Sequence, residues 1–120
     1  MTRGARKAGL SRRHRFVGRG AFASVLRSPR KIRGKTMLLH IAAGPAGLSR
    51  LGLSVPKRQA SRAVDRNRLK RQAREAFRRH GVRSAGLDLV FTVRQKFDPA
   101  EADAWRDEFA ALLDRAAAAP

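Results

Sequence analysis

The side chains best suited to bind another molecule lie in one run, residues 66–79, with the sequence RNRLKRQAREAFRR. Successive residues of a helix are turned by about 100°. This spacing gathers the apolar side chains on one arc: Leu69, Ala73, Ala76 and Phe77. A neighbouring arc of similar width gathers polar and cationic side chains: Asn67, Lys70, Arg71, Arg74 and Arg78, bordered by Arg66. The run therefore predicts a helix with one side for packing and one side for an anionic ligand.

Like charges follow one another at i,i+4 along this predicted helix, from Arg66 to Lys70, Arg74 and Arg78. Each such pair costs a few tenths of a kcal/mol when isolated, and a merely solvated face usually mixes charges of both signs. Phosphate groups would remove the repulsion. Asn67 adds a neutral donor and acceptor, which could bind a ribose 2′-hydroxyl, a base edge or a metal-bound water.

The charge of the whole chain favours the same kind of ligand. The formal net charge is +19. Residues 1–97 hold 26 basic and 3 acidic side chains, whereas residues 98–120 hold 2 basic and 6 acidic ones. Nucleic acid is the first candidate partner because contact with its phosphates releases counterions. An anionic membrane surface is the second candidate.

Several other kinds of site are not supported by the sequence. The chain has no cysteine, so disulfides and thiolate metal sites are excluded. The three histidines lack the spacing of zinc ligands. Gly34-Lys35-Thr36 has Pro29 where a phosphate-binding loop needs its first glycine, and Ser54 lacks the glycine pattern of a nucleophile elbow. We therefore predict neither catalytic residues nor a metal site in this chain.

The length of 120 residues suits a single domain. We predict a disordered basic arm over residues 1–15, one nucleic-acid-binding domain over 16–117 and a frayed end over 118–120. No apolar run approaches the roughly 20 residues of a membrane span. The basic N-terminus has no apolar stretch behind it, so no secretory signal is expected.

Hydrophobic periodicity predicts an α+β fold, a single-domain α-β sandwich in the order α-β-β-α-β-α, with helices packed on a small sheet. Ser61 and Gly81 are expected to cap the second helix, and Asp98 with Pro99 to begin the third. The Gly- and Pro-rich turn between the first two strands predicts a hairpin or meander. The expected elements are a helix over 19–27, strands over 36–42 and 50–55, a helix over 61–80, a strand over 87–93 and a helix from 98 onward.

The segment GLSVPKRQASRAVDRNRLKRQAREAFRR resembles the core of the bacterial ribonuclease P protein family, and looser resemblance extends from about residue 15 to 113. The resemblance implies a left-handed βαβ crossover around the second helix. It also implies a cleft for the single-stranded 5′ leader of precursor tRNA, with Phe22 in it, Leu26 where relatives often have an aromatic, and Phe16 nearby. The RNA-binding residues expected on this basis are Lys57, Arg58, Arg66, Asn67, Arg68, Lys70, Arg71, Arg74 and Arg78.

The function implied by the resemblance is that of a protein subunit that helps a catalytic RNA remove the leader. Its partners would be ribonuclease P RNA and precursor tRNA, with Mg²⁺ held mainly by the RNA, in the cytoplasm. No membrane and no stable protein partner are expected. Composition alone would also allow a structural or ribosomal RNA-binding protein, a DNA-binding protein or a membrane-surface protein.

Overall fold

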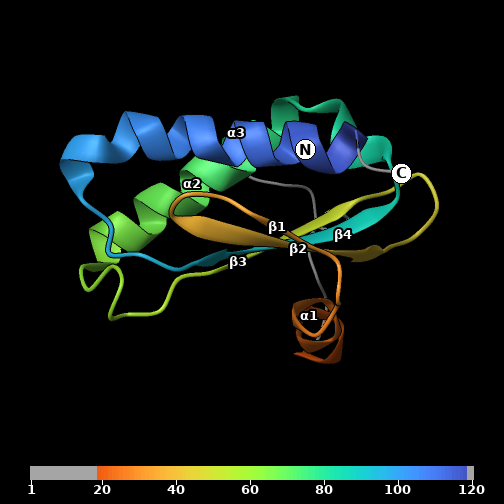
Figure 1. Ribbon diagram of the computed structural model, residues 1–120, viewed down its shortest axis with the longest axis horizontal. Helices are drawn as coiled ribbons and strands as arrows, with labels where there is room; N and C mark the ends of the chain where they lie inside the picture. The colour runs from red at the N-terminus through yellow and green to blue at the C-terminus, as the bar shows by residue number, and fades with distance from the viewer. Residues whose placement is uncertain (1–18, 119–120) are drawn as a thin grey trace, which may run out of the picture.

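Alternating apolar residues build a four-stranded sheet that has helices on both of its faces (Figure 1). The computed structural model describes residues 19–118. The elements in chain order are α1 (Arg19–Leu26), β1 (Lys31–Arg33), β2 (Met37–Ala43), β3 (Arg50–Ser54), α2 (Ala63–Arg79), the 3₁₀ turn η3 (Gly81–Ser84), β4 (Leu87–Val93), the 3₁₀ turn η4 (Pro99–Glu101) and α3 (Ala102–Ala118).

The strand order across the sheet is β1-β2-β4-β3. The strands β1 and β2 are antiparallel, as are β2 and β4, whereas β3 and β4 are parallel. The helix α2 lies in the connection between the two parallel strands, so the predicted βαβ crossover is present, while its left-handedness stays a prediction. The α+β class is confirmed, and the predicted element order gains the short edge strand β1.

The predicted hairpin between the first two long strands is wrong. The strand β4 lies between β2 and β3, so β2 and β3 do not pair with each other. Along one edge of β4, Val93 pairs with Met37 of β2. Along the other edge, Phe91 pairs with Leu53 of β3. The turn around Pro45 therefore connects two strands that are separated by a third.

The main core lies between the sheet and the helices α2 and α3. The odd-numbered residues of β2 and β4 face these helices, because side chains alternate along a strand. The rings of Phe91 and Phe109 meet edge to face with centroids 4.9 Å apart, and those of Phe97 and Trp105 do so at 5.0 Å. The residues of this core that are at most 1% exposed are Met37, Leu39, Ile41, Leu69, Ala73, Phe77, Leu89, Phe91, Val93, Phe109, Leu113 and Ala116.

The opposite face of the sheet is covered by α1, which packs on β2 and β4. Val25 of α1 is 2% exposed and Val90 of β4 is fully buried. The register places Lys31, His40, Val90 and Gly52 in one row across this face. The helix α1 ends at Leu26, and Ser28 bonds the carbonyl of Ile41 at 2.6 Å, so the helix is attached to the sheet where the chain leaves it.

Together with Asp88, His40 is one of the two titratable groups that the described residues bury on this face. It is 6% exposed, its Nε2 lies 2.9 Å from the Thr92 hydroxyl, and its Nδ1 has no partner among the described residues. Burial lowers the pKa of His40 below its ordinary 6.5, and the nearby charges of Lys31 and Arg94 lower this pKa further. The folded protein therefore resists protonation of His40.

We expect the free energy of unfolding to fall as the pH drops below about 6.5. The unfolded chain binds a proton at the ordinary pKa of histidine, whereas folded His40 binds it only at lower pH, so stability is lost on acidification. Urea denaturation at several pH values checks this. The loss should be smaller in His40→Gln, and an equal loss in both proteins would contradict the prediction.

The ends of α2 differ from the predicted caps. The N-cap residue is Arg62, without a side-chain bond, rather than Ser61. A turn in which Gln59 N donates to Pro56 O at 2.9 Å precedes the helix, and the helix begins at Ala63. Gly81 is not a left-handed cap. It is the first residue of η3. The N-cap of η3 is His80, whose Nδ1 accepts a hydrogen bond from Val82 N at 2.9 Å.

The beginning of α3 follows the predicted pattern, because Asp98 accepts a bond from Ala100 N at 3.0 Å and Pro99 opens η4. Further along α3, Glu108 accepts bonds from Thr36 N at 2.9 Å and from the Thr36 hydroxyl at 2.7 Å. These bonds fasten the turn between β1 and β2 to α3. Thr36 thus has a structural role.

The predicted arm over residues 1–15 and the predicted cleft residue Phe16 lie outside the described residues. At the other end, α3 continues to Ala118, and the rest of the predicted frayed end is not described. The domain limits stay predictions. Within residues 19–118, no helix is long and apolar enough to cross a membrane.

Candidate nucleic-acid interface

Three buried residues fix the orientation of α2. Leu69, Ala73 and Phe77 are fully buried, as their i, i+4, i+8 spacing predicts for one face of a helix. The fourth predicted member of this stripe, Ala76, is only half-buried. Because these side chains face the core, the polar arc predicted from the sequence is turned away from it.

Three side chains of this polar arc are exposed, together with Arg68 beside it: Asn67, Arg68, Lys70 and Arg71. We call them the α2 ridge. None of them makes a side-chain hydrogen bond or ion pair with any residue of the described range. Arg71 acts on Glu75 through its charge alone. The α2 ridge therefore presents three cations and one amide to an external ligand.

The other predicted residues of α2 are engaged within the protein or half-buried. Arg66 donates from Nη1 to the carbonyls of Ala60 at 2.9 Å and Ser61 at 2.8 Å, which holds the chain that leads into α2. Arg74 is half-buried, and its Nε is buried without a hydrogen-bond partner among the described residues. The spacing of residues along the helix did not predict these contacts.

Arg78 is the clearest departure from a row of free cations. It donates from Nη2 to both carboxylate oxygens of Glu75, at 2.8 and 3.0 Å. This bond, with the charges of Arg78, Arg79 and Arg71, lowers the pKa of Glu75 against the opposing effect of burial. The i,i+3 spacing of Glu75 and Arg78 could have revealed the pair. Arg78 would have to leave Glu75, or share its charge, to bind phosphate.

Lys57 and Arg58 lie in the loop between β3 and α2, and both are exposed. The loop is held at the next residue, Gln59, whose carbonyl accepts from Phe97 N at 2.7 Å and whose side-chain amide donates to Arg94 O at 3.2 Å. Neither Lys57 nor Arg58 makes a side-chain hydrogen bond or ion pair within residues 19–118. Both cations therefore add to the charge near the start of α2.

Two of the three predicted leader residues, Phe22 and Leu26, lie on α1. Phe22 and Leu26 are half-buried there, on either side of fully buried Val25 in sequence. The sheet face under α1 places further residues beside these two, and the sequence analysis did not predict them. Leu38, Thr92 and Ser54 form one row across it and are half-buried. Alternation along each strand predicts which face of the sheet these side chains are on. Only the order of the strands shows that the three residues are neighbours.

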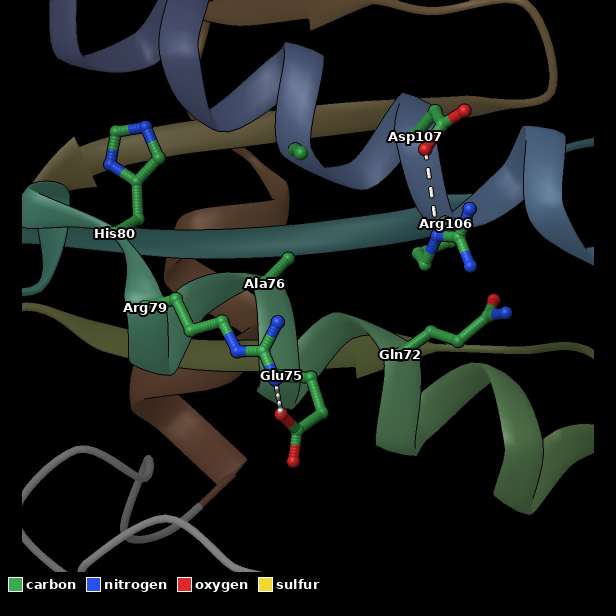
Figure 2. Close-up of a pocket in the computed structure, with 8 residues that line it drawn as sticks. Gln72, Glu75, Ala76, Arg79, His80, Arg106 and Asp107 are labelled. Carbon is green, nitrogen blue, oxygen red and sulfur yellow. Dashed lines mark ion pairs between the residues drawn. The ribbon is translucent and has the colours of Figure 1, made fainter.

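A separate groove of about 280 Å³ lies between α2 and α3. Figure 2 shows Arg79 beside Glu75 on α2, and Arg106 beside Asp107 on α3. Both ion pairs measure 3.5 Å. Ala76 and Ala110 supply apolar lining. The groove thus contains charges of both signs, in contrast to the α2 ridge. No group of three or more His, Cys, Asp or Glu within residues 19–118 could hold a metal ion.

A model of the family described as Ribonuclease P matches residues 10–117 of the chain. The chain belongs to the ribonuclease P protein family. The ribonuclease P protein component of Nitrosomonas eutropha is 38% identical over 98 residues, which are 80% of this chain and 81% of that protein. The component of Stutzerimonas stutzeri is 34% identical over 108 residues, 89% of this chain and 82% of that protein.

Solved structures of ribonuclease P proteins show the same fold. The Thermotoga maritima protein superposes with a TM-score of 0.67 at 29% identity, over 78% of this chain and 89% of that one. The Staphylococcus aureus protein, at 23% identity, has a TM-score of 0.70 over 86% of this chain and 94% of that one.

Membership of the ribonuclease P protein family gives the chain its function. It is a protein subunit of ribonuclease P and acts in the processing of tRNA 5′ ends. Ribonuclease P is a metal-dependent ribonucleoprotein endonuclease in which RNA is the catalyst, so the partner of this protein is ribonuclease P RNA.

Proposed function

We propose that the α2 ridge, with Lys57 and Arg58, binds the sugar–phosphate backbone of ribonuclease P RNA. The supporting observation is that Asn67, Arg68, Lys70 and Arg71 are exposed without intramolecular partners in the described range. Lysine and arginine gain affinity by displacing counterions from phosphates. Asn67, set among these cations, is placed to bind a ribose 2′-hydroxyl or a base edge.

We further propose that α1 and the sheet face beneath it hold the 5′ leader of precursor tRNA. Phe22 offers an aromatic face, on which bases stack for about 1–3 kcal/mol each without strong sequence preference. Leu26 lies one turn further along and has no aromatic ring, so the second stacking contact is weaker here. The half-buried row of Leu38, Thr92 and Ser54 supplies the floor of the proposed cleft.

The protein contributes binding and orientation, while the RNA holds the reacting groups. Mg²⁺, bound mainly by RNA and substrate phosphates, would activate water for cleavage of the phosphodiester bond. The cations of this chain screen the repulsion between catalytic RNA and substrate. Without the protein, a higher concentration of Mg²⁺ is needed to screen the same repulsion. We place this activity in the cytoplasm, together with precursor tRNA.

Reconstitution tests the proposal. The chain is mixed with ribonuclease P RNA and with precursor tRNAs whose leaders are one nucleotide or about ten nucleotides long. At low Mg²⁺ we expect the protein to raise the rate of cleavage, and to raise it more for the long leader because only that leader reaches α1. Equal stimulation of both substrates would contradict the leader cleft, and no stimulation of either would contradict the whole proposal.

A further inference from the structure

A second group of cations gathers around the edge strand β1 and the end of β4. It consists of Lys31, Arg33, Lys35 and Arg94, all of which are exposed. We call this group the β1-edge cluster. No acidic residue precedes Asp65 in the sequence, so the first three members have no acidic neighbour in the chain.

The fold brings these four side chains to one place. Lys31 pairs with His40 and Arg33 with Leu38, which turns both cations toward the sheet face covered by α1. Lys35 lies in the turn that follows β1, and Arg94 N donates to Thr36 O beside that turn at 2.8 Å. The positive charges of Lys31 and Arg94 both reach His40 and contribute to its lowered pKa.

No ion pair within the described part of the chain engages the four cations of this cluster. None of its four side chains makes a hydrogen bond or an ion pair with residues 19–118. Glu108 is the carboxylate beside this turn, and its hydrogen bonds go to Thr36 N and the Thr36 hydroxyl rather than to any of the four cations. Arg115 adds another cation, since its Nη1 donates to Arg33 O at 3.1 Å. Gathering such charges costs free energy that a polyanion would offset.

We propose that the β1-edge cluster, which borders the Leu38 row of the proposed leader cleft, is a further binding surface for the sugar–phosphate backbone of RNA. The inference rests on the proposed function but concerns residues outside the α2 ridge. The strand β1 is separated from β3, on which α2 packs, by two intervening strands, about 14 Å at ordinary strand spacing. The register turns Lys31 and Arg33 to the sheet face that α1 covers, whereas α2 lies on the other face of the sheet (Figure 1). The two surfaces therefore bind different stretches of backbone.

The double variant Lys31→Gln with Arg33→Gln tests this proposal. The matched control is Arg83→Gln with Arg106→Gln, which removes the same charge from exposed positions outside both surfaces. Each lost phosphate contact lowers the slope of log affinity against log salt by about 0.7 to 0.9. We expect the Lys31/Arg33 variant to lower this slope by about 1.4 to 1.8, so that wild type loses about tenfold more affinity than the variant between roughly 50 and 200 mM salt.

Two binding measurements identify the source of the phosphates. Weaker binding of ribonuclease P RNA assigns the cluster to the catalytic RNA. Unchanged binding of that RNA with weaker binding of precursor tRNA by the holoenzyme assigns it to the substrate. If the variant matches the control in both measurements, the proposal is wrong, and aggregation of the variant would then indicate that these charges only protect the sheet edge from strand addition.

The variant Arg71→Ala separates this proposal from the proposed function. If Arg71→Ala weakens RNA binding and the Lys31/Arg33 variant does not, only the second surface is wrong. If neither variant differs from the control, the proposed interface on α2 is wrong as well.

Discussion

The triple variant Arg68→Ala, Lys70→Ala and Arg71→Ala is expected to lose about a thousandfold or more of its affinity for ribonuclease P RNA, because each hydrogen bond to a charged group contributes about 1.5–3 kcal/mol and about 1.4 kcal/mol is tenfold in Kd. The slope of log affinity against log salt also falls by about 2 to 3, one phosphate contact for each cation removed. Filter binding or fluorescence anisotropy over a series of salt concentrations measures both quantities.

Folding should survive this triple substitution. The three side chains are exposed and unpaired in the described range, and alanine has the highest helix propensity. The melting temperature of the free protein should therefore stay within a few degrees of wild type. A large fall in melting temperature together with the loss of affinity would mean that the ridge is structural, and intact affinity would remove α2 from the interface.

Phe77→Ala is expected to destabilise the folded protein by about 3–5 kcal/mol, since Phe77 is fully buried and its removal leaves a large cavity. Urea denaturation followed by circular dichroism measures the change. Phe77→Leu is the matched control and should cost less, because the leucine fills much of the cavity. A cost below about 1 kcal/mol for the alanine variant would contradict the packing described for α2.

Ribonuclease P RNA should partly restore the stability of Phe77→Ala. A ligand that binds only the folded state stabilises it in proportion to the logarithm of its concentration over its Kd. The α2 ridge is intact in this variant, so the folded fraction binds RNA as wild type does. This behaviour distinguishes loss of folding from loss of the interface in the triple variant.

The two long helices were predictable because burial on one side imposes a period on their sequences. Trp105, Phe109, Leu112, Leu113 and Ala116 of α3 are all buried, as their spacing indicated. The same argument placed the ridge of α2 on the side away from the core. The beginning of α2 was not predicted correctly. A hydrogen-bonded turn over residues 56–59 precedes the helix, whose N-cap is Arg62 rather than Ser61.

The pairing of strands was not predictable from local pattern. The turn between β2 and β3 has the composition of a hairpin turn, but β4, the strand with the most buried residues, is inserted between them and is buried on both faces. The edge strand β1 has only three residues and a single half-buried side chain, Ile32. Three residues are too few for an alternating pattern to stand out.

Sequence reasoning found the residue types of the candidate interface and missed their partners. It grouped Arg78 with the free cations, whereas Glu75 binds it, and it could not see that Arg66 bonds the backbone before α2. The β1-edge cluster was missed because Arg94 joins residues 31–35 only through the sheet. Contacts between segments distant in sequence leave no periodic signal.

The central place of β4 has a consequence for biosynthesis. Every other long strand of the sheet pairs with residues 87–93, which leave the ribosome after all of them. Before β4 is made, β2 and β3 each have an edge without its partner strand. The sheet on which α2 packs is then also incomplete. Folding therefore waits for long-range contacts that form late and together. The α2 ridge takes its final direction only after β4 has been made.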